Sequence, residues 1–368
     1  MDFRSFWLET IPRPTAIGTG LIALDVVLNE RRHERPRLWA GGTCGNVLSI
    51  LAFLGWDAIP VSRLGSDAAS RLIRRDMRRW GVKLELLSLP PVANAPIVVH
   101  RLRQTPYGQP FHSFSLACPH CGRRLPGYRP IRQSAAGTAI RHLPEAQVVI
   151  VDRVSPGIIT LVKSAASRGA VVVFEPSGIH DKGLFRKMLA LTDVLKYSQE
   201  RFLDINPGWL KNVPLVIETL GRGGLRYRSR LNASKDDEWL HLDAFPVTLD
   251  RDSAGAGDWC TAGLVHGIAR RGAVGFRKLS DVRLRTSISF GQALAAWNCG
   301  YEGARGGMYA ASRQDFRREI EEVFAQRAAF ISRPEQKSSP PGNTVVAICA
   351  ECRRQLKAAA LDRLYHAS

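Results

Sequence analysis

The chain has 368 residues, of which 45% are hydrophobic, enough to form the core of one large α/β domain or of two ordinary domains. No apolar run approaches the roughly 20 residues of a membrane-spanning helix, and the first residues lack the pattern of a secretory signal. We therefore expect no membrane partner and a cytoplasmic location. The 52 Lys and Arg residues outnumber the 33 Asp and Glu residues, and a net charge of +19 favours phosphorylated or polyanionic partners.

Strand-like and helix-like segments alternate between residues 15 and 330, the pattern of an α/β fold with a largely parallel sheet. The clearest run predicts, in order, a strand at 148–152, a helix at 156–168, a strand at 170–174, a helix at 181–191 and a strand at 215–219. We expect one domain over residues 1–332. A polar, Pro-rich linker at 333–342 would then lead to a short appendage at 343–368.

Residues 96–115 alternate in short apolar runs around a turn at 106–110, which predicts a β-hairpin. The longer segment 86–144 contains no carboxylate. Its arginines are Arg101, Arg103, Arg123, Arg124, Arg129, Arg132 and Arg141. A segment with this charge is expected to face an anion.

The stretch 252–258 reads Asp-Ser-Ala-Gly-Ala-Gly-Asp and directly precedes an apolar, helix-compatible run at 259–268. We expect the backbone N–H groups of residues 254–257 to point from a helix N-terminus and to form an anion site. Phosphoryl transfer relies on such preorganised donors. Asp258 can take the proton of an attacking hydroxyl, and Asp252 can orient the loop. Taken alone, the pattern is equally typical of a simple helix start.

A second motif lies about 210 residues upstream, where Gly-Gly-Thr-Cys-Gly-Asn at 41–46 is followed by Leu-Gly at 54–55 and Gly-Ser-Asp at 65–67. With both motifs, the sequence resembles the ribokinase-like PfkB family, whose second signature reads Asp-Thr-x-Gly-Ala-Gly-Asp. Ser253 stands here for the Thr. The resemblance implies a three-layer ribokinase-like α/β fold with a mostly parallel central sheet and a small β lid. It also implies transfer of the γ-phosphoryl group of ATP, with Mg²⁺, to a hydroxyl of a sugar or nucleoside.

Further roles follow from the same resemblance. The catalytic group would comprise Asp258 as base with Gly255, Ala256, Gly257 and Asp252. The acceptor hydroxyls would be bound by Gly41, Gly42, Asn46 and Asp25, the last expected at the end of the first strand. The nucleotide side would comprise Thr219, Gly221, Gly224 and Asn298.

One departure from the family pattern concerns the metal. The family usually has Asn-x-x-Glu serving magnesium and phosphate, and here Arg201 falls on the position of that Glu. Glu200, one residue earlier, is carried over as its substitute. Rival nucleotide sites fare worse, because the chain has no Gly-x-x-x-x-Gly-Lys-Ser/Thr loop. The Gly-x-Gly-x-x-Ala run at 18–23 follows Pro12 and Pro14, which disfavour the strand that a Rossmann turn requires.

Four of the seven cysteines form two Cys-x-x-Cys pairs, Cys118 with Cys121 and Cys349 with Cys352. In a reducing compartment this spacing indicates metal, and four thiolates can enclose a structural Zn²⁺. The first pair follows the predicted hairpin and the second lies in the appendage, so zinc would tie the tail to the hairpin. Redox work by one pair is the alternative, although neither pair opens a helix after a strand as in thioredoxin-like proteins.

In ribokinase-like enzymes a β-hairpin near this position covers the acceptor site and often mediates dimerisation. The resemblance therefore implies a lid at about 95–135 and a homodimer formed through it. The arginines of this lid leave two interpretations open, an anionic acceptor such as a phosphosugar or nucleotide, and docking onto nucleic acid. The second is kept as an alternative function, that of a nucleic-acid-associated or regulatory protein that uses the kinase scaffold for binding.

Overall fold

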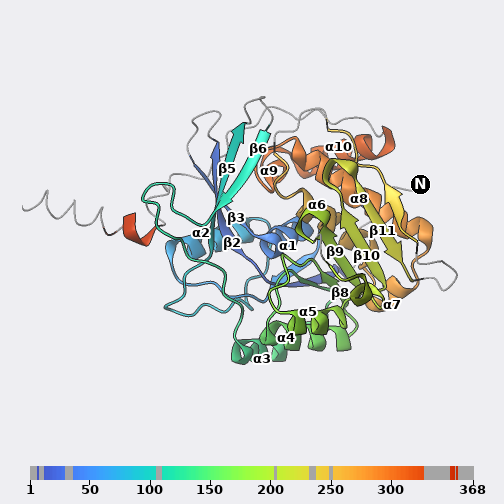
Figure 1. Ribbon diagram of the computed structural model, residues 1–368, viewed down its shortest axis with the longest axis horizontal. Helices are drawn as coiled ribbons and strands as arrows, with labels where there is room; N and C mark the ends of the chain where they lie inside the picture. Colours follow the sequence, from blue (N-terminus) through green and yellow to red (C-terminus); the bar gives the residue numbers. More distant parts are fainter. Residues whose placement is uncertain are drawn as a thin grey trace, which may run out of the picture.

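Eight strands form the main sheet of the computed structural model, which describes residues 6–7, 12–29, 36–104, 110–202, 205–231, 238–247, 252–326, 349–352 and 354. Across the sheet the strands run in the order β12-β11-β10-β9-β8-β7-β1-β4 (Figure 1). In chain order they are β1 (Thr15–Thr19), β4 (Asp57–Pro60), β7 (Val148–Val151), β8 (Val171–Phe174), β9 (Val194–Ser198), β10 (Leu215–Thr219), β11 (Leu225–Ser229) and β12 (Leu240–Leu242). The strands from β4 to β10 pair in parallel, and β11 and β12 are antiparallel.

Helices cover both faces of this sheet (Figure 1). They are α1 (Thr43–Phe53), α2 (Ala68–Arg79), α3 (Gln133–Arg141), α4 (Pro156–Ser167), α5 (Lys182–Leu189), α6 (Ala256–Ile268), α7 (Gly272–Arg277), α8 (Asp281–Cys299), α9 (Gly306–Ala310) and α10 (Arg313–Gln326). None of the described helices is long and apolar enough to cross a membrane.

Strand β7 shows why the sequence forms three layers. All four of its residues are apolar and buried, which is typical of a central parallel strand. Because side chains alternate along a strand, Val148 and Ile150 enter the core under α1, α6 and α8, whereas Val149 and Val151 enter the core under α3, α4 and α5. The predicted three-layer α/β fold is confirmed.

A second sheet of four strands, in the order β3-β2-β5-β6, forms the predicted β lid. Its strands are β2 (Ala23–Asn29), β3 (Arg37–Gly41), β5 (Ile97–Gln104) and β6 (Pro110–Ser115). The antiparallel pairing of β5 with β6 confirms the predicted hairpin. Of its predicted turn at 106–110, residues 106–109 lie outside the described residues and Pro110 begins β6. Asp25 lies within β2 and not at the end of the first strand, because the chain leaves the main sheet at Gly20, with a φ of 145°, and then enters the lid.

The five predicted strands and helices between 148 and 219 are present, with ends shifted by at most two residues, and β10 has the predicted bounds. The prediction missed β9, which lies between α5 and β10 in the sequence. Helix α6 begins three residues earlier than the apolar run, at Ala256, because Gly255 takes the left-handed conformation that starts it. The predicted linker at 333–342 lies outside the described residues. The same holds for the appendage 343–368, apart from residues 349–352 and 354.

Helix α6, which carries Asp258, packs against α8 with almost no space between the two backbones. A Cβ atom on Gly263 would lie 2.6 Å from the Cα of Gly291, and one on Gly291 would lie 2.4 Å from the carbonyl oxygen of Cys260. Real Cβ atoms do not approach backbone atoms so closely. The two glycines therefore set the distance at which α6 is held.

We predict that Gly263→Ala lowers the free energy of unfolding by about 1–3 kcal/mol, because the added methyl group forces α6 away from α8. The matched control is Gly137→Ala in α3, where a Cβ meets nothing within 4 Å. That substitution should raise stability by about 0.4–1 kcal/mol. Chemical denaturation measures both changes, and a Gly263→Ala protein as stable as the parent would contradict the close helix contact.

Candidate active site

The loop before α6 is held by Asp252, as predicted. One oxygen of its carboxylate accepts a hydrogen bond from the Ala254 N–H at 2.7 Å, and the other accepts one from the Gly303 N–H at 2.7 Å. Gly255 has a φ of 75°, and a Cβ there would lie 2.2 Å from the carbonyl oxygen of Ala304. No other residue fits this position without moving the loop.

The anion site at the start of α6 is smaller than the sequence predicts. Of the four predicted donors, the Ala254 N–H bonds to Asp252 and the Ala256 N–H bonds to the carbonyl of Ser253. Within the described chain, the N–H groups of Gly255 and Gly257 remain available, at the positive end of the helix dipole. Two backbone donors at a helix N-terminus are still suited to a phosphate oxygen.

Asp258 lies in the first turn of α6, where it meets the first motif. The amide Nδ2 of Asn46, in α1, donates a hydrogen bond of 2.7 Å to Asp258 Oδ2. The two motifs that stand about 210 residues apart in the sequence thus come into direct contact. Asp258 is partly exposed, and its desolvation and the nearby Glu175 raise its pKa to about 7, against the lowering effects of Asn46 and Lys196.

Beneath this turn lies a partly buried ion pair that no sequence motif indicates. Lys196, in β9, donates from Nζ to Glu175 Oε1 at 2.6 Å, and Thr261 donates to the other oxygen of Glu175. A Cβ on Gly257 would lie 3.5 Å from Glu175 Oε1 and 3.6 Å from Lys196 Nζ. Burial disfavours the charge of Lys196, but Glu175 outweighs this effect and raises the pKa of Lys196. A cation is therefore fixed directly beside the anion site.

A second missed residue, Arg305, fixes the orientation of the Asn46 amide. Arg305 is fully buried, and its Nε donates to Asn46 Oδ1 at 3.1 Å. Because a guanidinium only donates, Asn46 must present its oxygen to Arg305 and its NH₂ group to Asp258. Asp76 accepts from Arg305 at 2.7 Å and from Tyr309 at 2.8 Å, which holds the guanidinium in place.

The predicted acceptor residues lie together next to Asp258. Asp25 is buried in β2, where its Oδ1 lies 3.3 Å from Nε2 of His100. A Cβ on Gly41 would lie 1.8 Å from Asp25 Oδ2, so only glycine lets this carboxylate lie against the backbone. Gly42 then begins α1, which carries Asn46. Burial opposes protonation of His100, but Asp25 raises its pKa, so the two side chains form a contact that the sequence did not indicate.

The nucleotide-side residues lie at the carboxyl ends of β9 and β10. Thr219 ends β10, opposite Ser198 in register, and a tight turn follows in which Gly221 and Gly224 have φ values of 59° and 87°. Glu200 is exposed in the short 3-10 turn after β9. These positions at one sheet edge suit a nucleotide, and the contacts themselves stay predictions.

Asn298, the remaining nucleotide-side residue, is fully buried at the end of α8. Its Nδ2 donates to the carbonyls of Gly303 and Ala304, at 3.3 Å each, and its Oδ1 accepts from the Gly307 N–H at 3.2 Å. Because its amide is engaged within the protein, Asn298 shapes the loop at 303–307. A direct contact between its side chain and a nucleotide stays a prediction.

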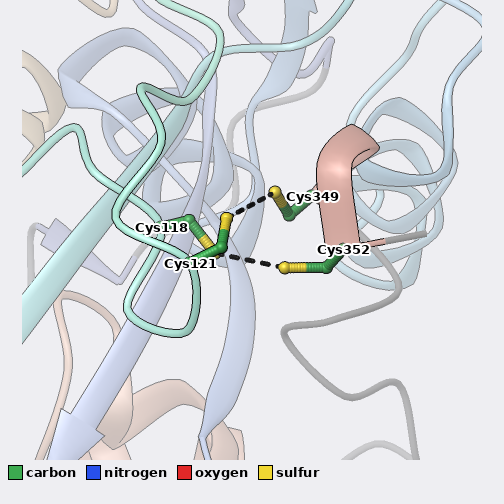
Figure 2. A group of neighbouring side chains, drawn as sticks. All are labelled: Cys118, Cys121, Cys349 and Cys352. Atoms are coloured by element: carbon green, nitrogen blue, oxygen red, sulfur yellow. Dashed lines mark hydrogen bonds between the residues drawn. The ribbon is translucent and has the colours of Figure 1, made fainter. Parts of the chain in front are cut away.

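The four paired cysteines meet at one point, although the pairs are more than 220 residues apart (Figure 2). Their sulfur atoms all lie within 4.8 Å of one another, with Cys118 Sγ 3.8 Å from Cys352 Sγ and Cys121 Sγ 3.7 Å from Cys349 Sγ. A tetrahedral zinc with Zn–S bonds of about 2.3 Å sets its sulfur atoms about 3.8 Å apart. The four side chains therefore have the composition and spacing of a zinc site.

We predict that Asp258→Asn makes the folded protein more stable near neutral pH. The raised pKa means that the folded state binds more protons than the unfolded state between about pH 4 and pH 7, so ionisation of Asp258 lowers stability as the pH rises through that range. Removal of the charge should add up to about 4 kcal/mol at pH 8 and nothing below pH 4.

Denaturant unfolding of parent and variant across this pH range measures the effect. Asp181→Asn is the matched control, because Asp181 is an exposed N-cap of α5 and Asn caps a helix equally well. If the stability difference between the parent and Asp258→Asn is the same at pH 4 and pH 8, the pKa of Asp258 is not raised in the folded protein.

Residues 146–310 match the model of the pfkB family carbohydrate kinases. A comparison with curated protein sequences finds no significant match. Among solved structures, the chain is similar to a nucleoside kinase of Burkholderia thailandensis in complex with inosine, with 18% identity and a TM-score of 0.62 over 84% of this chain and 97% of the other. It is also similar to the aminoimidazole riboside kinase of Salmonella enterica, with 18% identity and a TM-score of 0.62 over 84% of this chain and 100% of the other.

A ribokinase of Giardia lamblia is similar as well, with 16% identity and a TM-score of 0.63 over 86% of this chain and 100% of the other. At these identities the likeness establishes the fold. The fold is therefore ribokinase-like, and with the pfkB-type carbohydrate kinase match at residues 146–310 it supports a phosphotransferase that acts on hydroxyl groups.

Proposed function

We propose that the protein is a kinase that transfers the γ-phosphoryl group of ATP to a hydroxyl of a sugar or nucleoside, with Asp258 as the general base. The observation that carries this proposal is the contact between Asn46 and Asp258 at the N-terminus of α6. It brings a base, an amide for acceptor hydroxyls and two backbone donors to one place. This combination is what phosphoryl transfer to an alcohol requires.

Proton transfer is assigned to the free oxygen of Asp258. Its Oδ2 accepts from Asn46, which leaves Oδ1 to accept the proton of the acceptor hydroxyl. A base acts best when its pKa lies near the working pH, and the pKa of Asp258 is raised to about 7 by desolvation and by Glu175. We therefore expect Asp258 to be both charged and basic near neutral pH.

Negative charge develops on the transferred phosphoryl group. We assign its stabilisation to the N–H groups of Gly255 and Gly257 and to the ammonium group of Lys196. The two N–H groups are preorganised by the turn at Gly255 and do not have to reorient during the reaction. Lys196 is held by Glu175 at 2.6 Å, so its charge is fixed close to the same turn. Asp25 and Asn46 would orient the acceptor through two of its hydroxyls.

For the nucleotide we assign the turns at Thr219, Gly221 and Gly224 and the loop held by Asn298. A fructokinase of similar fold from Xylella fastidiosa has bound ATP. Mg²⁺ bound at the phosphates would neutralise their charge, and Glu200 is the residue that we assign to it. Its exposed position after β9 leaves its carboxylate accessible to a metal that arrives with the nucleotide.

The acceptor class follows from the related kinases, whose structures contain inosine and aminoimidazole riboside. The lid also exposes Phe114 and Leu116, with 60% and 43% of their side chains accessible, in and just after its edge strand β6. Exposed apolar side chains beside an edge strand are suited to a second copy of the chain. This supports a homodimer through the lid, and the cytoplasmic location remains an expectation.

We predict that Asp258→Asn lowers turnover by about 10²- to 10⁴-fold, because the acceptor hydroxyl loses its base. ATP consumption is measured across a panel of sugars and nucleosides, and ATP binding by calorimetry shows that the variant still forms its nucleotide site. Phosphorylation at the parental rate by the variant would exclude Asp258 as the base.

We further propose that Cys118, Cys121, Cys349 and Cys352 hold a structural zinc ion that attaches residues 349–354 to the lid. The sulfur spacing fits tetrahedral ZnS₄, and all four cysteines are free thiols. The first pair forms a compact turn, because the Gly122 N–H bonds to the carbonyl of Cys118 at 2.9 Å. A thioredoxin-like role is not favoured, because all four sulfur atoms face one another.

We predict about one zinc ion per chain, and Cys121→Ala should reduce this content because a three-thiolate site binds zinc more weakly. Metal analysis measures the content, and limited proteolysis shows whether residues near Cys349 become more accessible when the metal is lost. Cys299→Ala is the control, since Cys299 lies outside the cluster. Zinc well below one per chain in both native and zinc-reconstituted protein would overturn the proposal.

A further inference from the structure

A cavity of about 470 Å³ lies beside the cysteine cluster, between the loop before β5 and the tail segment. Its described lining comes from residues 92–94, 123–127, 129, 349–351 and 354. Four arginines line it, namely Arg123, Arg124, Arg129 and Arg354. We call it the arginine cavity. Cys349 forms part of its wall, so the zinc proposed above would hold one side of the cavity in place.

Positive charge in the arginine cavity is almost uncompensated. Within the described chain, no carboxylate lies in ion-pair distance of Arg123, Arg124 or Arg129. The lining contains one acidic residue, Glu351, which lies 4.0 Å from Arg354. Guanidinium groups that line one cavity repel one another, so their arrangement favours the binding of an anion.

Arg129 also belongs to a second group of arginines, with Arg63 and Arg132. Arg63 follows β4, and its Nε is buried and has no hydrogen-bond partner within the described chain. Partial burial and the charges of Arg132 and Arg129 lower the pKa of Arg63. Arg129 and Arg132 are exposed, and both act electrostatically on Arg63. An unpaired buried donor among like charges is the arrangement expected of an anion site that awaits its ligand.

The wall of the arginine cavity is hydrogen-bonded to the lid. The Ile97 N–H, at the start of β5, bonds to the carbonyl of Pro126 in the cavity wall at 3.0 Å. Ile97 is also the register partner of Leu24, the residue before Asp25 in β2. The wall of the cavity and the carboxylate assigned to acceptor hydroxyls are therefore joined through neighbouring strands of the lid.

The arginines also lie on the side of the site opposite the nucleotide turns. Arg153 bonds to Asp152 at 3.0 Å and stacks on Tyr128, the residue before Arg129. Asp152 follows β7, and Arg63 follows β4 at the far edge of the sheet. The nucleotide turns follow β9 and β10 on the other side of β7. An acceptor whose hydroxyl faces Asp258 would extend its far end toward the arginines.

We propose that Arg63, Arg129 and the arginine cavity bind a phosphate monoester carried by the acceptor, so that the substrate is a phosphorylated sugar or a nucleoside monophosphate. This inference rests on the proposed kinase function. Guanidiniums bind phosphate through paired, charge-assisted hydrogen bonds, and an arginine-rich site distinguishes a phosphorylated acceptor from its neutral counterpart. The volume of the cavity lies within the range of small-molecule sites.

The test uses matched acceptors, ribose with ribose 5-phosphate and inosine with inosine 5′-monophosphate, on the full chain loaded with zinc. We expect one phosphorylated acceptor to have a kcat/KM at least about 10²-fold above that of its neutral counterpart, an effect of about 3 kcal/mol. Arg129→Gln and Arg63→Gln should raise its KM about tenfold or more with kcat unchanged, and leave the KM of the neutral acceptor unchanged.

Arg141→Gln is the matched control, because Arg141 belongs to the same carboxylate-free segment but bonds only within α3. Binding of the same four compounds to the Asp258→Asn protein, measured by calorimetry, separates this inference from the kinase proposal. If a phosphorylated compound binds in an arginine-dependent way but the parent protein does not turn it over, the arginine site is supported and the kinase proposal is contradicted.

Two outcomes would overturn the inference. One is turnover in which neutral and phosphorylated acceptors are equivalent and the arginine variants behave like the parent, which leaves the kinase intact. The other is that the parent binds a single-stranded oligonucleotide with a steep salt dependence and binds none of the four small compounds. If Arg129→Gln and Arg63→Gln then lose the oligonucleotide binding, the arginines serve nucleic-acid binding.

Discussion

The environment of the Asp258 carboxylate is the constraint on which the rest of the structure depends. The first turn of α6 places this carboxylate close to Glu175 and Asp152 and removes much of its water, and these effects disfavour its charge. The Asn46 amide and Lys196 act in the opposite direction and keep ionisation accessible. The surroundings that make the folded protein less stable near neutral pH therefore also make Asp258 a stronger base.

One short loop maintains this environment from two sides. At residues 303–305, the Gly303 N–H fixes Asp252 and therefore the start of α6, while Arg305 fixes Asn46 and therefore the start of α1. The loop also lies against the lid, because a Cβ on Gly303 would lie 1.9 Å from the Trp39 ring. Asp258, Asn46 and the lid thus share one support.

Hydrophobic periodicity made the fold readable from the sequence. Buried runs such as 148–151 and 171–174 can be placed because four consecutive apolar residues fit a central strand and little else in an α/β chain. Glycine motifs predicted the starts of α1 and α6, because backbone segments in close contact require glycine. The role of Asp25 in the acceptor site stays a prediction. Its expected place at the end of the first strand is wrong, because the departure of the chain from the main sheet at Gly20 has no hydrophobic signature.

Residues that act through distant partners could not be found in this way. Lys196 lies in β9 and Glu175 directly follows β8, and Arg305 meets Asn46 across 259 positions of sequence. A single buried Lys or Arg in an apolar stretch was the only available signal, and the sequence does not say which carboxylate or amide it meets. The cysteine cluster, in contrast, was predictable, because the spacing of a Cys-x-x-Cys pair is set by the geometry of metal coordination and does not depend on the fold.

Charge is divided along the active-site edge of the main sheet in a way that suits a reaction between two anions. The turns after β9 and β10 and the start of α6 are assigned to the donor. Arg63 follows β4 on the opposite side of β7, and the charges of Arg129 and Arg132 act on it. A phosphorylated acceptor and ATP repel each other strongly when their reacting atoms come within contact distance. In the proposed complex, arginines at the far end of the acceptor would offset this repulsion without occupying the space around Asp258. Because Cys349 forms part of the wall of the arginine cavity, the proposed zinc would hold that wall in place.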